Sequence, residues 1–316
     1  MSGVSVLIPS ARGGAGLLAL VEGMLAAPGG GVEVLVADNG LDPQVSSALR
    51  AAGATVVEMG ENAGFGRAVN RLAEEAGGAA LVVTNDDIDP AAGFVGALAA
   101  PVLAGAEMAA GVLLQAERPQ LIETAGVVID RLLGSHDHLH GEPLAVLAEE
   151  QPPPLGPSGG AAAFDREAFL SLGGYDEGFF AYIEDVDLAL RLRAAGARCE
   201  LAADARALHA TSATFGFGSL AKAVAVGRSR GRLLRKYGVL SRPGRAAAVL
   251  AIEAAAAARQ AARHRSAAPL RARVEGWRRC TDRAEFPPRS LAGIGVLSGI
   301  SGRLARQRRR PIAPPP

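Results

Sequence analysis

Short apolar runs alternate with amphipathic segments over the first hundred residues. The apolar runs predict buried strands, and the amphipathic segments predict helices that bury one face. Strands are predicted at residues 4–8, 32–37, 55–58 and 80–84, and helices at 15–26, 45–52, 67–76 and 94–104. This alternation predicts an α/β fold with a doubly wound, mostly parallel sheet flanked by helices.

The pattern loosens after residue 104. Further strands are predicted at 108–114, 123–129, 198–201 and 207–209, and further helices at 166–172 and 185–195. Residues 132–151 are predicted to be irregular. From residue 220 onward the chain is predicted to be helical, with breaks at 238–244 and 286–289, and residues 308–316 are predicted to be disordered.

Charge divides the chain into two parts. Residues 1–216 carry 11 basic and 28 acidic side chains, whereas residues 217–316 carry 22 basic and only 4 acidic ones. Such asymmetry indicates two units with different surroundings. We expect a catalytic or binding domain over 1–216 and a basic, Ala- and Arg-rich helical extension over 217–307. The extension would either contact an anionic partner or dock on the acidic unit.

Two cysteines, Cys199 and Cys280, provide neither a disulfide framework nor zinc-ligand spacing. Free thiols are typical of a reducing cytoplasm. The first residues lack the features of a signal peptide, and no apolar run is long enough to cross a membrane. The expected location is therefore cytoplasmic, with the basic extension as a candidate contact for the inner face of the cell membrane.

Polar residues and a proline lie at or just after the ends of the early strands. They are Pro9, Ser10, Asp38, Asn62, Asp86 and Asp87. In a parallel sheet the strand ends form one crevice, so these residues could converge on a ligand. Asp38 is either a turn carboxylate, since Asp-Asn-Gly favours turns, or an acceptor for a nucleobase or ribose.

The segment Asn85-Asp86-Asp87 can be interpreted in two ways. Adjacent carboxylates suit a hard divalent cation that also binds substrate phosphates, but they also suit a helix N-cap. The Gly64-Phe65-Gly66-Arg67 segment matches neither a dinucleotide fingerprint nor a P-loop. Arg67 could face a phosphate, although an ordinary turn from loop to helix is the preferred interpretation of this segment.

Three carboxylates, Glu184, Asp185 and Asp187, open the helix predicted at 185–195. They are candidates for acid/base chemistry, or they simply favour a helix N-terminus through its dipole. His209 is a candidate metal ligand or a structural histidine. His136, His138 and His140 alternate, which would place them on one face of a strand as a metal site. Because their segment is predicted to be irregular, a solvated loop is the preferred interpretation.

Together these motifs resemble the family 2 glycosyltransferases of the GT-A fold, most closely the bacterial rhamnosyltransferase type. The resemblance covers residues 3–240 and depends on the order and spacing of its parts. The parts are residues 4–9, 34–40, 61–70, 82–87, 159–162 and 173–192, followed by His209. Asn85 stands where many relatives have the first Asp of an Asp-x-Asp motif, a substitution that is frequent in sequences of this type.

The resemblance implies a role for each matching residue. Asp38 would contact the base of a nucleotide-sugar and Asp86 its ribose. Asp87 and His209 would hold Mn²⁺ or Mg²⁺ on the diphosphate, and Asp185 would be the general base of an inverting transfer. Further donor contacts are expected at Pro9, Ser10, Asn62, Gly64, Arg67 and Asn70, and acceptor contacts at Gly159, Gly160 and Glu184.

The implied donor is dTDP-rhamnose or a UDP-sugar. The implied acceptor is a hydroxyl of a cell-envelope or polysaccharide molecule, which is either a saccharide or a sugar carried on a polyprenyl diphosphate. Arginines near the C-terminus, beside the apolar residues 291–300, could then lie on an anionic membrane surface. A nucleotidyltransferase acting on sugar phosphates is an alternative, but the chain lacks an N-terminal triphosphate loop. A basic adaptor with a degenerate domain is another alternative, and nucleic acid is otherwise not expected as a partner.

Overall fold

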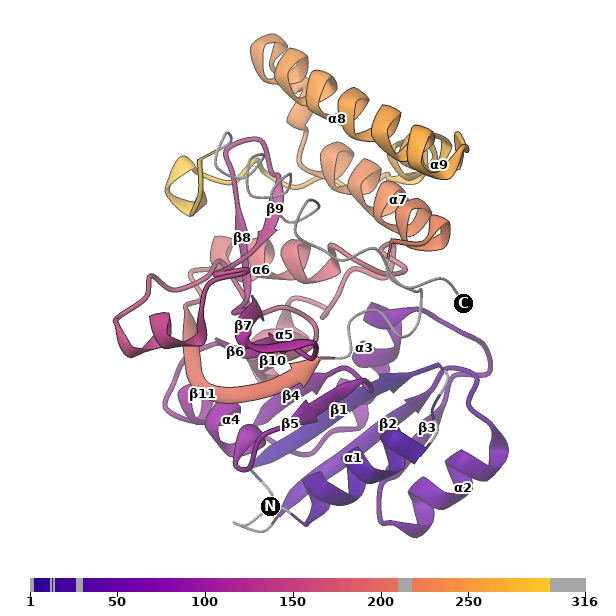
Figure 1. Ribbon diagram of the computed structural model, residues 1–316, viewed down its shortest axis with the longest axis vertical. Helices are drawn as coiled ribbons and strands as arrows, with labels where there is room; N and C mark the ends of the chain where they lie inside the picture. Colours follow the sequence, from indigo (N-terminus) through magenta and orange to yellow (C-terminus); the bar gives the residue numbers. More distant parts are fainter. Residues whose placement is uncertain (1–2, 12, 14, 27–30, 210–217, 296–316) are drawn as a thin grey trace.

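The computed structural model describes residues 3–11, 13, 15–26, 31–209 and 218–295 (Figure 1). Its centre is a nine-stranded sheet in the order β3-β2-β1-β4-β10-β6-β11-β5, with β7 paired to β6. The strands are β1 (Val4–Ser10), β2 (Val32–Asp38), β3 (Thr55–Glu58), β4 (Ala80–Thr84), β5 (Ile88–Pro90), β6 (Met108–Gln115), β7 (Arg118–Thr124), β10 (Ala161–Asp165) and β11 (Cys199–His209).

Most strands of this sheet run in one direction. β1, β2, β3 and β4 are parallel to one another, and β6 and β11 follow the same direction because β10 is antiparallel to both β4 and β6. The carboxyl ends of β1, β2, β4 and β11 and the amino end of β10 therefore lie at the same edge. The mostly parallel α/β fold expected from the sequence is confirmed.

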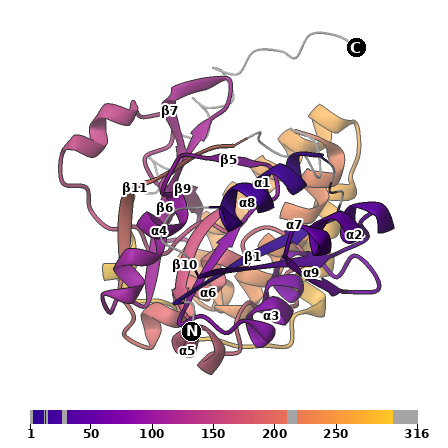
Figure 2. The same cartoon turned by 90° about the horizontal axis from the view of Figure 1, so that it is seen from below.

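Helices cover both faces of the sheet (Figure 2). One face packs against α1 (Ala15–Leu25), α2 (Pro43–Ala51) and α4 (Phe94–Leu103), and the other against α3 (Phe65–Glu75), α5 (Arg166–Ser171) and α6 (Glu184–Ala194). Side chains of β1 alternate between the two cores: Val6 and Ile8 belong to the first, and Leu7 to the second. Burial on both faces explains why these strands are continuously apolar.

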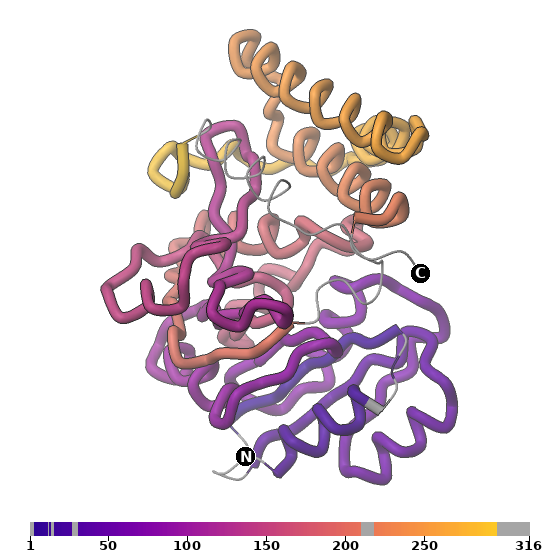
Figure 3. Tube along the Cα trace, viewed as in Figure 1, coloured from indigo at the N-terminus to yellow at the C-terminus, as the bar shows by residue number. Residues whose placement is uncertain are grey.

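Three helices follow the sheet: α7 (Leu220–Lys236), α8 (Pro243–His264) and α9 (Ala268–Arg279) (Figure 3). α7 and α9 cross closely at glycines, since a Cβ at Gly231 would lie 2.0 Å from the carbonyl oxygen of Arg273. A third apolar core joins these helices to α6, with Leu190 of α6, Leu233 of α7 and Val249 of α8 all buried. No helix in the described ranges is long and apolar enough to cross a membrane.

Several predicted elements are wrong in detail. The strand expected at 123–129 is two strands, because Gly126 turns the chain with a φ of 101° between β7 and β8 (Val127–Ile129). β8 pairs with β9 (Ser135–Asp137) inside the segment predicted to be irregular. β10 was not predicted, since a run of alanines carries no β-branched signal. The strands expected at 198–201 and 207–209 form the single strand β11, whose register shifts between Leu201 and Arg206.

The short 3₁₀ helices were also missed. They are η1 (Leu144–Ala148), η2 (Val239–Ser241) and η3 (Arg289–Leu291). Beyond α9 the described chain has no further α-helix, contrary to the prediction for residues 280–285. These residues have no regular secondary structure and precede two consecutive prolines, Pro287 and Pro288. The disorder predicted for 308–316 and the arginines at 303–310 lie outside the described residues.

Candidate active site

A cavity of about 470 Å³ lies at the edge of the sheet where the strand ends meet. Its walls come from segments far apart in sequence, because the parallel strands β1, β2, β4 and β11 all end there. Of the residues singled out from the sequence, the cavity is lined by Pro9, Asn62, Gly64, Asp86, Asp87, Gly159, Gly160, Glu184, Asp185 and His209. Ser10, Asp38, Arg67 and Asn70 are not among the lining residues.

Sheet register brings Asp87 and His209 together. His209 is the last residue of β11 and pairs with Ile88, the residue that follows Asp87. Nε2 of His209 lies 3.2 Å from Oδ1 of Asp87, and its Nδ1 lies 3.2 Å from Oε2 of Glu123. Burial alone would lower the pKa of His209, but contacts with Asp87 and Glu123 raise it to about 9.

This pair fits a divalent cation. A carboxylate oxygen and an imidazole nitrogen about 3 Å apart can both reach one Mn²⁺, while Mg²⁺ prefers oxygen alone. Glu123 stands behind the histidine, where carboxylates commonly orient a ligating imidazole. Within the described ranges no group of three or more His, Cys, Asp or Glu residues is arranged to hold a metal. A cation bound here would take its other ligands from substrate and water.

Asp86 is positioned by β1. Oγ of the buried Ser10 donates a hydrogen bond to Oδ2 of Asp86, so the residue after Pro9 orients a carboxylate at the cavity wall. The neighbouring Asn85 lies with its Nδ2 3.3 Å from Nε2 of His209. Ser10 therefore contacts the site through Asp86 rather than as a lining residue.

Asp38 is engaged by its own turn. Its carboxylate accepts hydrogen bonds from the backbone N–H groups of Gly40 and Leu41 and from Oγ of Ser46, at 3.0, 2.7 and 2.6 Å. Burial raises its pKa, but these bonds outweigh it and lower the pKa overall. The adjacent Asn39 lines the cavity instead and donates to the carbonyl oxygen of Gly64 at 3.3 Å.

The glycine loop before α3 touches the loop before α6. Gly64 has a φ of 85°, and a Cβ there would lie 2.4 Å from the backbone oxygen of Phe180. The N–H of Phe65 donates to that same oxygen at 3.0 Å. Only glycine allows this close approach, which lets Asn62 and Gly64 face the cavity beside the start of α6.

Arg67 and Asn70 lie on α3 outside the cavity. Arg67 is exposed, and its Nε lies 3.8 Å from Glu177. Asn70 donates from Nδ2 to the carbonyl oxygen of Tyr175 and accepts from the N–H of Tyr175, both at 2.8 Å. Asn70 thus fastens the loop that leads to α6, and donor binding by these two residues stays a prediction.

The start of α6 presents carboxylates to the cavity. Oδ2 of Asp185 accepts from the N–H of Gly159 at 3.4 Å, and Oδ1 accepts from the N–H of Val186 at 2.8 Å. Burial raises the pKa of Asp185 to about 6, and the charge of Asp137 adds to this. Burial also raises the pKa of Glu184 well above its ordinary value. A carboxylate with a pKa near 6 is suited to accept a proton near neutral pH.

The three alternating histidines do not form one site. The buried His136 lies 3.2 Å from Asp130, and burial lowers the pKa of His138. His140 lines the cavity, with Nδ1 2.5 Å from the carbonyl oxygen of Glu123. β9 ends at residue 137 and Leu139 has a φ of 53°, so the alternation breaks. Both the metal site on one face and the solvated loop are wrong.

Several lining residues escaped the sequence reasoning. They include Asn39, Glu123, Asp137, Phe180, Tyr182 and Lys222. Asn39 and Tyr182 adjoin residues that were singled out, so a wider window would have found them. Glu123 lies on β7, which pairs with β6, and Asp137 lies on β9, which pairs with β8. The sequence did not reveal either pairing. Lys222 belongs to α7, and its Nζ lies 5.2 Å from the ring centroid of Tyr182.

Comparison with known proteins places this site in context. A family model described as glycosyl transferase family 2 matches residues 5–170. None of the curated proteins compared with the sequence matches it.

Two solved structures illustrate the similarity of fold. GalNAc-T7, solved with UDP, GalNAc and Mn²⁺, is 15% identical to this chain with a TM-score of 0.57. The match covers 75% of this chain and 48% of GalNAc-T7, so this chain spans about half the length of GalNAc-T7. The mannosyltransferase PcManGT from Pyrobaculum calidifontis, solved with GDP-Man and Mn²⁺, is 18% identical with a TM-score of 0.54, and 88% of each chain is covered. Both similarities concern the fold.

Proposed function

The chain belongs to glycosyl transferase family 2, and on that premise we propose that it moves a sugar from a nucleotide-sugar to a hydroxyl of an acceptor with inversion at the anomeric carbon. One observation carries the proposal. Asp87, Asp185 and His209 come from three separate segments, the residue before β5, the start of α6 and the end of β11, but all line the same cavity. A leaving diphosphate and an attacking hydroxyl need these two kinds of group on either side of the sugar.

The donor would bind at the ends of β1, β2 and β4. In this arrangement Asp86, oriented by Ser10, accepts a hydrogen bond from the ribose, while Asp38 and Asn39 lie toward the base. Pro9, Asn62 and Gly64 complete the wall on this side. The proposed donor is dTDP-rhamnose or a UDP-sugar. The solved structures of similar fold hold UDP or GDP-Man, which supports a nucleoside diphosphate in general.

Asp87 and His209 would hold Mn²⁺ or Mg²⁺ against the diphosphate. The cation supplies positive charge that stabilises the oxygen leaving the anomeric carbon. Mn²⁺ accompanies the nucleotide in both solved structures of similar fold, which supports a divalent cation here. Glu123 keeps the imidazole oriented toward Asp87.

Asp185 would act as the base. Its carboxylate accepts the proton of the acceptor hydroxyl while the hydroxyl oxygen bonds to the anomeric carbon and the carbon–diphosphate bond breaks. The nucleoside diphosphate leaves with the electron pair of that bond. The N–H of Gly159 holds one carboxylate oxygen, and Gly160 and Glu184 shape the acceptor side.

The acceptor side of the cavity is acidic. Asp137 and Asp185 line it together, so a neutral sugar hydroxyl is accommodated more readily than an anionic group. We therefore propose a saccharide acceptor, including one at the far end of a polyprenyl diphosphate. Of the 22 basic side chains beyond residue 216, those not buried in ion pairs would contact the anionic membrane surface on the cytoplasmic side that carries such a lipid.

The metal-dependent donor site is tested by thermal shift. A panel of nucleoside diphosphates and nucleotide-sugars, each with and without Mn²⁺, is added to wild type, Asp87→Asn and Asp89→Asn. Asp89 is a matched control because it lies two residues away with its side chain exposed. A ligand at a hundred times its Kd should stabilise the wild type by about 2.7 kcal/mol.

We expect one base to give a shift that needs Mn²⁺, disappears in Asp87→Asn and persists in Asp89→Asn. A shift that is equal in both variants would place the nucleotide elsewhere. No shift with any nucleotide at high Mn²⁺ would favour the adaptor alternative.

A further inference from the structure

The segment from Asp176 to Asp187 contributes several residues to the cavity wall. Phe180, Ala181, Tyr182, Glu184 and Asp185 all line the cavity. Within the segment Tyr182 and Ile183 have φ values of 67° and 73°, in the left-handed region that residues with side chains rarely adopt. Two such residues in a row, directly before Glu184 and Asp185, require outside contacts to hold them in place.

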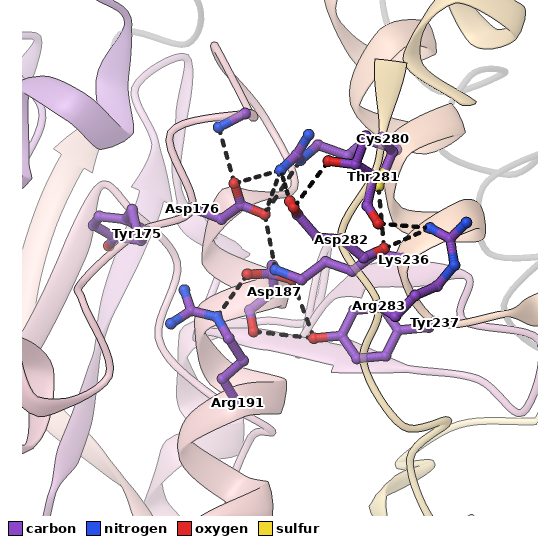
Figure 4. Close-up of polar contacts among 12 residues, drawn as sticks. Tyr175, Asp176, Asp187, Arg191, Lys236, Tyr237, Cys280, Thr281, Asp282 and Arg283 are labelled. Carbon is purple, nitrogen blue, oxygen red and sulfur yellow. Dashed lines mark hydrogen bonds and ion pairs between the residues drawn. The ribbon is translucent and has the colours of Figure 1, made fainter. Parts of the chain in front are cut away.

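Several of those contacts come from α7. Nζ of Lys236 lies 2.8 Å from Oδ2 of Asp176 and 2.7 Å from Oδ1 of Asp187, so one ammonium group joins the two ends of the segment (Figure 4). Lys236 is 6% exposed and Asp187 is fully buried. An ion pair this deeply buried is costly to break, because the remaining charges lose both water and their partner.

Other partners hold one end of the segment each. Arg232 contacts Asp176 at 2.7 Å, whereas Arg191 contacts Asp187 at 2.8 Å. On the middle of the segment, Oγ of Ser229 donates to the carbonyl oxygen of Ala181 at 2.8 Å. Among the ion pairs of the described ranges, the two made by Lys236 connect both ends. Lys236 itself does not line the cavity.

We propose that Lys236 is a positioning residue for sugar transfer, which joins the ends of segment 176–187 and so holds Asp185 against the acceptor side of the cavity. The inference rests on the proposed function in one respect, that Asp185 is the base. It assigns to Lys236, the last residue of α7 and about 50 residues beyond Asp185 in sequence, a part in positioning the base. Asp87 directly precedes β5 and His209 ends β11, both outside the 176–187 segment, so donor binding should not depend on Lys236.

The test compares Lys236→Met, Lys236→Arg and the milder Asp176→Asn with a control, Arg230→Met. Arg230 also lies on α7 and is mostly buried, but it pairs with Glu253 of α8 and the carbonyl oxygen of Leu133. Each variant is measured for kcat and donor KM, for nucleotide binding, and for hydrogen–deuterium exchange of peptides that cover 176–187.

We expect Lys236→Met to lower kcat about tenfold to a hundredfold, because small displacements of a catalytic group have effects of that size. Donor KM and nucleotide binding should change less than about twofold, and exchange should rise in 176–187. Asp176→Asn should show the same pattern more weakly, and Lys236→Arg should recover most of the kcat. Arg230→Met should leave both kcat and the exchange of 176–187 near wild type.

Unchanged exchange of 176–187 in Lys236→Met and Asp176→Asn would overturn the inference, and so would an unchanged kcat. An equal loss of kcat in Arg230→Met would also overturn it, since the effect would then be general destabilisation of α7. If the wild type transfers no sugar, the proposed function fails, while the exchange data still decide whether Lys236 holds the segment.

Discussion

The residues proposed for chemistry differ in how their surroundings tune them. Asp38 is held in its ionised form by three hydrogen bonds, whereas Asp185 is placed where burial favours its protonated form. The two aspartates therefore suit different purposes: Asp38 is a permanent hydrogen-bond acceptor, and Asp185 is a group that can gain a proton. This difference favours Asp185 over Asp38 as the candidate base.

The pKa of Asp185 predicts the acid limb of the pH–rate profile. Because burial raises this pKa to about 6, the carboxylate is increasingly protonated below pH 6 and cannot accept a proton there. We expect kcat/KM to fall as the pH drops through about 6 and to reach a plateau above it. The measurement is kcat/KM for the acceptor between about pH 3.5 and 8, because kcat/KM reports the pKa of the free enzyme.

Asp137→Asn provides the control for this profile. The negative charge of Asp137 is one of the causes that raise the pKa of Asp185, so its removal should move the acid limb to lower pH. An acid limb near pH 4 in the wild type, or a limb that moves upward in Asp137→Asn, would contradict the assignment.

Single residues were predictable where a motif places them at the end of a strand or the start of a helix. Asp86, Asp87, Asp185 and His209 were all expected at the site, and all line one cavity. Glu123 was not, because its importance depends on the distance of 3.2 Å to His209 that only the folded β7 and β11 create. Asn39 was overlooked because its neighbour Asp38 has the more obvious chemistry.

At the scale of elements, the close contact between the loop before α3 and the loop before α6 shapes the site. Gly64 tolerates its φ of 85° and leaves room for Phe180, and Gly60 also has a positive φ, of 74°, with no atom near its missing Cβ. An alanine at either position would adopt an unfavourable φ, but only an alanine at position 64 would also meet a neighbouring atom. Comparing the two substitutions therefore separates the cost of the backbone conformation from the cost of the steric contact.

Gly64→Ala should destabilise the fold by about 1–3 kcal/mol more than Gly60→Ala, since the new methyl group meets a backbone oxygen as well as an unfavourable φ. Gly64→Ala should also weaken nucleotide binding, because Gly64 lines the cavity. Urea unfolding and a nucleotide titration of both variants measure these effects. Equal stabilities and equal affinities would show that the loop contact is unimportant.

Elements were predictable where the hydrophobic pattern is strong. The early strands and helices lie within a few residues of their predicted positions, because buried β1, β2 and β4 are rich in valine and leucine. β10 has three alanines in a row and depends on β4 and β6 for its conformation. β8 and β9 are three residues each and form through their pairing, which local propensity does not encode.

At the scale of the whole molecule, the charge asymmetry finds a partial explanation. Lys236 and Arg232 of the basic part form buried ion pairs with Asp176 and Asp187 of the acidic part, and their helix shares an apolar core with α6. Docking of one part on the other, which the sequence left as an alternative, is therefore observed for α7. The division at residue 216 and the membrane contact stay predictions.

The central claim is that this one cavity transfers a sugar with Asp185 as the base. It is tested most directly by following the anomeric proton by NMR, with the donor found in the binding panel and a saccharide acceptor, for wild type and Asp185→Asn. We predict a product of inverted configuration from the wild type. Asp185→Asn should bind donor normally but react about 10² to 10⁴ times more slowly. Retention of configuration, or an Asp185→Asn variant as fast as wild type, would contradict the account.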